Sequence, residues 1–490
     1  MIKPLSERKK MSEAISITPT DARTLSEGGV PEDISILRKI TVGQDNLLNF
    51  LSEQYLDSYI PDGGSKIKMV TGRPGVGKTN FSRLMLAEAE DHGYLTVHFS
   101  AESVWLHDFR EVYLEVLRQC DLEKILQGCA DMIIQKMGYD PSEISEGKTF
   151  MDFLSETGNG DVIGRNEIRT YLREMFTRNP LLDNNFASCC SLIVGGKLGY
   201  PPLEASAKEL LMAFLHGDKT VKFSMLRALG LSPARITKYN ARHLLRSLAE
   251  TVHNGGFKGI LIVIDDMEIL QDKHAQGPVR YTKVRREDTY ESIRQLIDDI
   301  DSMRYLMFLL CFDRVLMDND DIGIKSYQAL WMRIQNEVVS PRFNAFADII
   351  DLDRYADQFY TTDVLCEMAA RLAGVLQYSE TGVPVLDEDA AMKLIEQSQY
   401  GGLGLPYLVN RKVIEIISDG RKQEDSAVQA LDAGRQGTYD TARNFASGKQ
   451  AQTDDADQQC AYNTARDSAS DKQVLADDAN QQCAYEGTEG

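Results

Sequence analysis

The sequence of 490 residues has less positive than negative charge. Its 54 Lys and Arg side chains stand against 74 Asp and Glu side chains, which gives a net charge of -20 at pH 7. The molecule as a whole therefore repels polyanions such as nucleic acids. Any contact with a nucleic acid has to come from a local cluster of basic residues.

The chain also lacks paired cysteine motifs and long apolar runs. None of its 8 cysteines forms a C-x-x-C pair or lies in a histidine pattern typical of zinc sites. The N-terminus has no apolar signal-peptide core, and no window approaches the roughly eighteen uninterrupted apolar residues of a membrane span. We therefore expect reduced thiols, no disulfide framework, no membrane segment and a cytoplasmic location.

Short apolar runs alternate with amphipathic segments along most of the chain. The runs KIKMVTG, YLTVHFS, GILIVID and YLMFLLCFD predict strands. Helical periodicity fills the long interval between the second and third runs, and it returns after residue 354. Strands that alternate with helices favour a parallel sheet, so we predict an α/β fold.

One segment between a predicted strand and a predicted helix, GRPGVGKT, matches the phosphate-binding pattern G-x-x-x-x-G-K-[ST]. Glycines in such a loop let backbone N–H groups converge on phosphates, and the helix N-terminus adds positive potential. We predict that Lys78 reaches the outer phosphates of ATP and that Thr79 ligates Mg²⁺. The residues predicted to bind the nucleotide are Gly72, Arg73, Pro74, Gly75, Val76, Gly77, Lys78, Thr79 and Asn80.

Carboxylates follow directly after the third predicted strand. Asp265 is the candidate that orients Mg²⁺, usually through water, because this cation keeps several waters at a phosphate site. Asp266 is the candidate that polarises the attacking water, although aspartate is one methylene shorter than the glutamate that usually fills this role. Glu268 is the alternative base. The competing interpretation is that Asp266 and Glu268 only cap or pair locally.

Three further residues are candidates for roles at the terminal phosphate. Asp313 ends the fourth predicted strand, where many such ATPases place a polar residue that senses this phosphate. Arg333 and Arg342 are candidates for arginine fingers, which would reach the nucleotide of a neighbouring subunit and so imply an oligomer. A surface salt bridge is the competing interpretation for either arginine alone.

A basic cluster with interleaved tyrosines lies between the third predicted strand and the next helix, at residues 280–294. It is the best local candidate for DNA contact that we find in the sequence, and a solvated face or a partner contact is the competing interpretation. Its members are Arg280, Tyr281, Lys283, Arg285, Arg286, Tyr290 and Arg294.

These elements predict four regions. The N-terminal segment is polar, and the P-loop ATPase domain that follows carries a large helical insertion; a small helical lid domain and an acidic low-complexity tail with 23-residue repeats complete the chain. We place these regions at 1–40, at 41–354 with the insertion at about 102–257, at 355–420, and at 421–490. The tail has few large aliphatic residues, so we expect it to be solvated unless its repeats stack or bind a partner.

The ordered series of motifs resembles the P-loop ATPases of bacterial BREX phage-exclusion systems, in particular the BrxD type and the ATPase domain of BrxC. The segments that carry the resemblance are GGVPEDISILRKITVGQDNLLNFL, GRPGVGKTNF, LLMAFLHGDKTVKFSMLRALGL, GFKGILIVIDDMEIL, IRQLIDDID and PRF. The resemblance implies an AAA-like ATPase that uses ATP and Mg²⁺. It also implies work with other proteins of an antiviral defence system that includes DNA methylation, on or near DNA.

The chain departs from the family pattern at several positions. The usual Asp-Glu pair after the third strand is Asp265-Asp266 here. Where relatives tend to have Pro-Arg in the last helix, this chain has Pro406 and Tyr407, and Arg411 one turn later is a candidate substitute. The segment VGQD at residues 42–45 resembles a segment that contacts the base in related ATPases, or it simply begins a helix.

Three functions are consistent with this sequence. The first is an ATP-hydrolysing subunit of a phage-defence complex that remodels or gates its partners on DNA. The second is a nucleotide-dependent assembly switch with little hydrolysis. The third is an Orc/Cdc6-like ATPase that loads onto DNA, for which an initiator would carry a winged-helix domain where this chain has low-complexity repeats.

Overall fold

The computed structural model describes residues 17–158, 162–272, 277–338, 342–377 and 385–419. They belong to a unit of the chain that spans Met1–Arg421. The second unit, Lys422–Gly490, contains the predicted repeats and lies outside the described residues. Everything below concerns the first unit.

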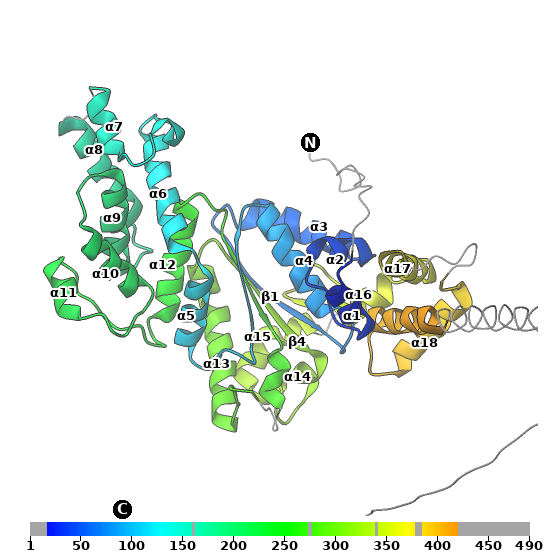
Figure 1. The fold of residues 1–490 in the computed structure, drawn as a ribbon. Coiled ribbons are helices and arrows are strands. Elements are labelled where there is room, and N and C mark those ends of the chain that lie inside the picture. The colour runs from blue at the N-terminus through cyan, green and yellow to red at the C-terminus, as the bar shows by residue number, and fades with distance from the viewer. Residues whose placement is uncertain (1–16, 159–161, 273–276, 339–341, 378–384, 420–490) are drawn as a thin grey trace, which may run out of the picture. The chain divides into compact units, whose positions relative to one another are not determined.

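The described strands form one parallel sheet in the order β2-β3-β4-β1-β5 (Figure 1). Their bounds are Ser65–Gly72 for β1, Leu95–Ser100 for β2, Ile260–Asp265 for β3, Leu306–Asp313 for β4 and Ile349–Asp351 for β5. The predicted α/β fold with a parallel sheet is therefore confirmed. Strand β5 was not predicted, because three residues are too few to show a periodicity.

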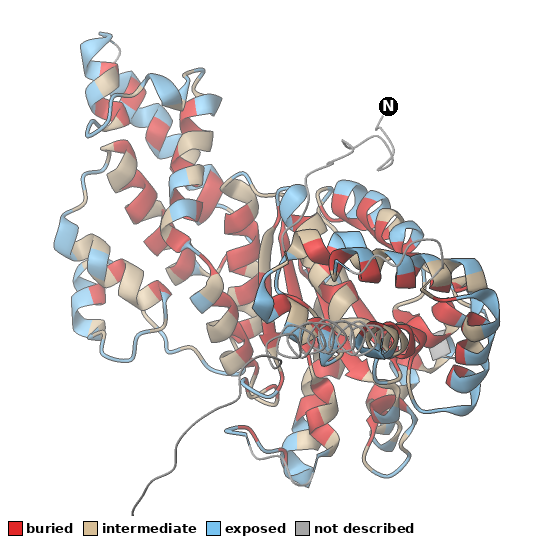
Figure 2. Cartoon of the chain, turned by 45° about the vertical axis from the view of Figure 1, so that its right-hand side comes forward, coloured by how far each residue is buried: buried red, intermediate tan, exposed pale blue. Residues whose placement is uncertain are grey.

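Alternate residues of the central strands face two separate cores, as expected for a parallel sheet covered on both sides. Ile260, Ile262 and Ile264 of β3 contribute to the core shared with the helices between β2 and β3. Leu261 and Val263 contribute to the core shared with the N-terminal and C-terminal helices. Figure 2 shows this burial concentrated in the sheet and on the inward faces of the helices.

The chain between β2 and β3 is helical, as its periodicity indicated. These helices are α5 (Phe109–Gln119), α6 (Leu122–Lys136), η3 (Pro141–Glu143), α7 (Phe150–Glu156), α8 (Val162–Leu172), η4 (Arg173–Thr177), α9 (Asn184–Leu198), α10 (Ala205–Leu215), α11 (Phe223–Ala228) and α12 (Ala241–Asn254). Helices α5 and α12 pack against each other and connect this group to the sheet (Figure 1). The group therefore shares its apolar core with one face of the sheet.

Helices at the two ends of the unit pack over the other face. At the N-terminal end they are α1 (Pro19–Ser26), α2 (Ile34–Ile40), α3 (Asp45–Leu51) and η2 (Ser52–Tyr59), followed after β1 by α4 (Lys78–Asp91). At the C-terminal end they are α16 (Leu352–Phe359), α17 (Thr362–Val375), α18 (Glu388–Tyr400) and a helix at 405–419. Our sequence analysis described residues 1–40 only as polar and missed α1 and α2, whose few apolar residues are buried against this core.

The remaining helices follow β3 and β4. They are η5 (Met267–Gln271), α13 (Lys283–Asp299), η6 (Ile300–Ser302), α14 (Arg314–Asp318), η7 (Ile324–Ser326) and α15 (Gln328–Val338). Within the described ranges no helix is long and apolar enough to cross a membrane. Every cysteine in those ranges is a free thiol.

Candidate functional site

The carboxyl ends of β1, β3 and β4 meet at one edge of the sheet. Gly72 at the end of β1 is in register with Asp313 at the end of β4. The pairing of Ile264 with Leu310 places Asp265 at the same edge, level with Cys311 of β4. Parallel strands place the residues that follow them at a common edge, which is where ligands of open α/β sheets bind. Residues from widely separated parts of the chain thus surround the P-loop.

The P-loop presents main-chain donors that the protein does not use. Among the described residues, none accepts a hydrogen bond from the N–H groups of Gly75, Gly77, Lys78 or Thr79. Gly75 and Gly77 have φ values of 78° and 99°, a region that glycine adopts without strain. The loop leads directly into α4, whose first turn adds positive potential. Unused main-chain donors at a helix N-terminus are the features typical of sites that bind phosphate groups.

Lys78 is held at this edge by the predicted sensor residue. Its Nζ lies 2.5 Å from Oδ1 of Asp313 and 3.4 Å from the carbonyl oxygens of Gly72 and Arg73. The N–H of Asp313 in turn donates to Oε2 of Glu268, at 3.3 Å. The structure therefore brings together Lys78, Asp313 and Glu268, all three of which the sequence singled out.

Burial, and after it the neighbouring Asp313 carboxylate, raise the pKa of Glu268 to about 7. A carboxyl group with this pKa exchanges its proton near neutral pH. That property is suited to a general base.

Thr79 and Asp265 meet beside the P-loop. Asp265 is buried, and burial together with the charge of Asp266 raises its pKa, whereas a hydrogen bond from the Thr79 hydroxyl lowers it. A hydroxyl and a carboxylate in contact supply the hard oxygen donors that Mg²⁺ prefers. Within the described residues no group of three or more acidic, His or Cys side chains is arranged so that it could hold a metal ion by itself.

Asp266 has an unusual backbone conformation. Its φ of 56° and ψ of 34° place it in the left-handed region, where aspartate is tolerated better than most residues. Its N–H donates to Oδ1 of Asp265, at 3.0 Å. The N–H of Asp266 therefore helps to orient the Asp265 carboxylate. Asp266 also precedes the short helix η5, which carries Glu268.

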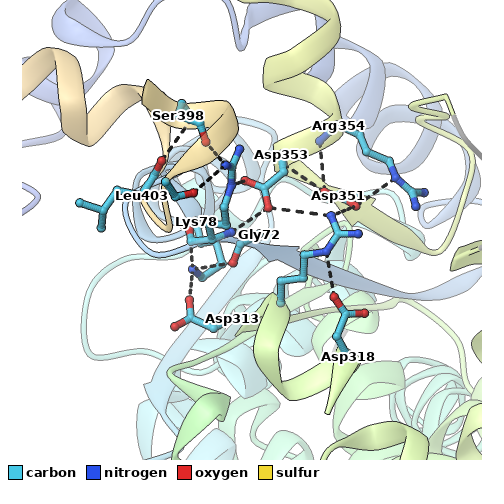
Figure 3. A network of polar contacts seen from close by, with 12 residues as sticks. Gly72, Lys78, Asp313, Asp318, Asp351, Asp353, Arg354, Ser398 and Leu403 are labelled. Atoms are coloured by element: carbon cyan, nitrogen blue, oxygen red, sulfur yellow. Dashed lines mark hydrogen bonds and ion pairs between the residues drawn. The ribbon is translucent and has the colours of Figure 1, made fainter. Parts of the chain in front are cut away.

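Arg73 ties the P-loop to the C-terminal helices. Its main-chain N–H and its Nε donate to the two carboxylate oxygens of buried Asp353, each at 2.9 Å (Figure 3). Its guanidinium also donates to the carbonyl oxygens of Ser398 and Gly401 at the end of α18. One arginine thus connects the phosphate loop, α16 and α18.

A second arginine extends this network to the end of β4. Arg314, next to Asp313, contacts Asp351 at 3.1 Å and Asp318 at 3.0 Å (Figure 3). Asp351 caps α16 by accepting the N–H groups of Asp353 and Arg354. The residue after the predicted sensor is therefore linked through α16 to the partner of the P-loop arginine. Our sequence analysis missed this network, because its members are far apart in the chain.

The segment between α18 and the last described helix lies directly on the P-loop. The N–H of Gly404 donates to the carbonyl oxygen of Pro74 at 2.9 Å, and the N–H of Tyr407 donates to that of Gly75 at 3.1 Å. A Cβ atom on Gly404 would lie 2.4 Å from the N and Cα atoms of Val76. Tyr407, which occupies the position of the family's arginine, packs its side chain against Gly75 instead.

A cavity of about 440 Å³ opens beside the P-loop, within the roughly 300–1,000 Å³ range of small-molecule pockets. Apolar side chains from four parts of the chain line it, together with Gln44, Asn80 and the P-loop. The apolar members are Leu25, Val30, Pro31, Ile40, Val42, Met368, Leu372, Pro406 and Val409. Its position and lining suit the base and ribose of a nucleotide whose phosphates occupy the loop.

The segment VGQD combines both interpretations that the sequence left open. Val42 and Gln44 line the cavity, whereas Asp45 is the first residue of α3. Arg411, the candidate substitute for the family's arginine, is exposed and does not line the cavity.

The two arginine-finger candidates lie on the surface. Arg333 forms an ion pair with Asp298, with Nε 3.1 Å from Oδ1. Arg342 is exposed in the segment that precedes β5. The pairing of Arg333 with Asp298 is the surface salt bridge that the competing interpretation predicts for this residue.

The basic cluster at 280–294 is less available than its sequence indicated. Tyr281 and Tyr290 are buried, and their hydroxyls donate to the carbonyl oxygens of Val104 and Ile322. Arg294 is paired with Glu291 and Asp298. The guanidinium of Arg285 lies 4.3 Å from the centroid of the Trp105 ring. Neither tyrosine can stack on a base without leaving the core.

Comparison with known proteins identifies a family. The model of the family described as BREX system ATP-binding protein BrxC/D matches residues 22–429 of this chain, which confirms the resemblance found in the sequence. Neither the search of curated proteins nor the search of solved structures found a match.

The contact between Gly404 and the P-loop leads to a first prediction. Gly404→Ala should weaken ATP binding at least tenfold, because its Cβ would push against the main chain of Val76 and Gly75. A Cβ on Gly402 would meet no atom within 4 Å, so Gly402→Ala is the matched control. Dissociation constants for a fluorescent ATP analogue, measured beside thermal melts, test this. Equal constants for the two variants would show that the contact does not shape the loop.

The raised pKa of Glu268 leads to a second prediction. Protonated Glu268 stabilises the folded state below its unfolded pKa of roughly 4.5, and this contribution is lost as pH rises through its folded pKa of about 7. Without nucleotide or divalent cation, the wild type should lose on the order of 2–3 kcal/mol relative to Glu268→Gln between pH 5 and 8. Urea denaturation measures this, with the exposed Glu146→Gln as control. A parallel pH dependence of wild type and Glu268→Gln would contradict it.

Proposed function

The chain belongs to the family of BREX system ATP-binding proteins BrxC/D, and from this premise we propose that it is a magnesium-dependent, AAA-like ATPase of the defence complex. The observation that carries the proposal is the set of unused N–H groups at the start of α4, beside Lys78 and a cavity of about 440 Å³. A loop that presents several unpartnered donors to one point is built for phosphate oxygens.

In this proposal the P-loop residues Gly72 to Asn80 bind the nucleotide, and Thr79 and Asp265 hold Mg²⁺. When bound, the cation neutralises charge on the β- and γ-phosphates. Lys78 leaves Asp313 for the outer phosphates, and Asp313 is then available as a sensor. The Lys78–Asp313 ion pair thus represents the resting arrangement of the site.

We assign the general base to Glu268 before Asp266. Glu268 contacts the main chain of Asp313, and its pKa of about 7 allows it to accept a proton near neutral pH. Asp266 has a shorter side chain, and its N–H is used to orient Asp265. Asp266 therefore supports the site through the backbone, and Glu268 polarises the water.

The domain organisation of the proposal follows the sequence analysis. Residues 41–354 are the ATPase domain with its helical insertion at about 102–257, and residues 355–420 are the lid. Through Arg73, Gly404 and Tyr407, the lid contacts the same loop that would bind the phosphates. A change at the γ-phosphate would therefore alter the lid, which gives the ATPase a way to remodel or gate its partners on DNA.

A second candidate function is an assembly switch with little hydrolysis. The same lid contacts favour it, since binding of ATP alone would already change them. It differs from the first function in turnover and not in the fold.

Substitutions at the site separate these possibilities. Lys78→Ala and Asp265→Ala should abolish ATP hydrolysis, since phosphate and cation would lose their main contacts. Glu268→Gln should lower kcat by about 10²–10⁴-fold, the range for general base catalysis, and retain bound ATP, whereas Asp266→Asn should retain most of the turnover. Phosphate release and bound-nucleotide assays measure both quantities.

If Asp266→Asn lost turnover and Glu268→Gln retained it, Asp266 would be the general base. If the wild type bound ATP tightly and showed no measurable hydrolysis, the result would favour the assembly switch. Wild-type activity in Lys78→Ala would contradict the assignment of the whole site.

The arginine candidates lead to a test of oligomerisation. We propose that Arg333 and Arg342 act on the nucleotide of a neighbouring subunit. A double variant, Arg333→Ala with Arg342→Ala, should be inactive alone, as should Lys78→Ala. Mixing the two should restore part of the activity, because one subunit then supplies the arginines and the other the intact P-loop. Light scattering with ATP and Mg²⁺ gives the state of assembly, and no recovery on mixing would argue against action between subunits.

A further inference from the structure

The segment that joins α10 to α12 through α11 carries a concentration of positive charge. Between Asp218 and Glu250 the chain has seven basic residues and no acidic one, in a molecule with a net charge of -20. We refer to residues 217–239, all of which are described, as the basic loop. Its helix α11 lies on the side of the helical insertion that faces away from the sheet, and the chain then returns to α12 (Figure 1).

The basic loop has a defined conformation. Its two ends lie together, because a Cβ atom on Gly217 would be only 2.9 Å from Cδ1 of Ile236. The N–H of Ser232 donates to Oδ1 of Asn185 in α9, at 2.9 Å. These contacts close the loop and attach it to the helices beneath it.

Most apolar residues of the basic loop point inward, and Met225, 52% exposed, is the exception. Leu226 and Leu231 are buried in the core of the insertion. The ring of Phe223 packs edge-on against Phe214, with the centroids 6.4 Å apart. Because the apolar side chains are used in this way, the polar side chains of the loop face solvent.

The outward face carries cations, hydroxyls and one aromatic ring. The exposed cations are Lys219, Lys222, Arg227, Arg235 and Lys238, and the exposed hydroxyls are Thr220, Ser224, Ser232 and Thr237. Tyr239 is 83% exposed, and Nζ of Lys238 lies 5.4 Å from its ring centroid. None of the five cations has an ion pair with a carboxylate in the described part of the chain.

We propose that the basic loop is a docking surface for the phosphate backbone of double-stranded DNA. Lys and Arg side chains, supported by Ser, Thr and Tyr hydroxyls, are the groups that contact DNA phosphates. The inference rests on the proposed function in one respect, the expectation that this defence ATPase acts on DNA. The loop itself is separate from the proposed nucleotide site. The cluster at 280–294 has acidic neighbours and buried tyrosines, and therefore it serves as the comparison surface.

The chemistry of the loop favours duplex DNA over other polyanions. Binding of single strands uses a series of aromatic side chains on which successive bases stack, whereas this loop exposes only Tyr239 among its aromatic residues, all of them described. An acidic protein segment would need apolar anchor pockets for affinity. The cavity beneath the loop measures about 30 Å³ and holds no more than about one water.

The test uses the full chain and a fluorescent 30-base-pair duplex of arbitrary sequence, with anisotropy read across a series of salt concentrations. Replacing all five cations of the basic loop with glutamine should weaken binding at least tenfold at low salt. The magnitude of the slope of log K against log salt should fall by about 4.5, since each of the five lost phosphate contacts contributes about 0.9. The control variant carries Arg280→Gln, Lys283→Gln and Arg286→Gln and should bind within about twofold of wild type.

Binding of a fluorescent ATP analogue is measured for every variant. Unchanged ATP binding in the five-residue variant shows that the fold and the nucleotide site are intact, so a loss of DNA binding is specific to the loop. If the wild type failed to bind ATP, the result would count against the proposed function. The DNA measurements would still test the basic loop, because they do not depend on the nucleotide.

Several results would overturn the inference. They are no duplex binding by the wild type at 50 mM salt, an equal loss in the control variant, tighter binding of a single strand than of the duplex, and complete competition by poly-glutamate at equal charge. The first result would mean that the protein does not bind duplex DNA, the second that the loss is not specific to the basic loop, and the third that a single strand is the preferred ligand. The last result would indicate an acidic protein partner.

Discussion

Parallel pairing of β1, β3 and β4 is the constraint on which the rest of the structure depends. It brings Gly72, Asp265 and Asp313 to one edge of the sheet, although β2 and the long helical insertion lie between β1 and β3 in the chain. All three strands are buried on both faces, so a shift in register would move apolar side chains as well as site residues. The position of the site is therefore as stable as the core itself.

Opposite charges balance each other at this edge of the sheet. Unused N–H groups and Lys78 create positive potential, and Asp313 together with Glu268 supplies the opposing carboxyl groups. Crowding of acids in a buried place raises the pKa of Glu268 towards neutrality. A nucleotide that takes Lys78 would change the environment of both acids at once. Ligand binding and the protonation state of the site are thus physically coupled.

The contacts of Arg73 connect the P-loop to the C-terminal helices α16 and α18. Asp353 holds both the main chain and the side chain of this arginine, and the carbonyl groups at the end of α18 hold its guanidinium. Gly404 then brings a second stretch of backbone against the same loop. By contrast, the basic loop lies on the insertion, which shares its core with the opposite face of the sheet. The nucleotide site and the DNA-docking surface that we propose are therefore separate from each other.

The sequence by itself determined the P-loop, the acidic end of β3, the helical interval before it and the parallel α/β fold. These features are local, because a glycine pattern, an apolar run or a helical period is complete within a few neighbouring residues. It did not determine α1 and α2, β5, the network of Arg73 and Arg314, or the choice between Glu268 and Asp266. It also favoured the cluster at 280–294, whose tyrosines turned out to be buried, over the basic loop, although the absence of acids after Asp218 was visible. Only the tertiary structure supplied α1, α2, β5, the arginine network and the burial of the two tyrosines, because burial and pairing depend on residues that are distant in the chain and become neighbours when the strands align.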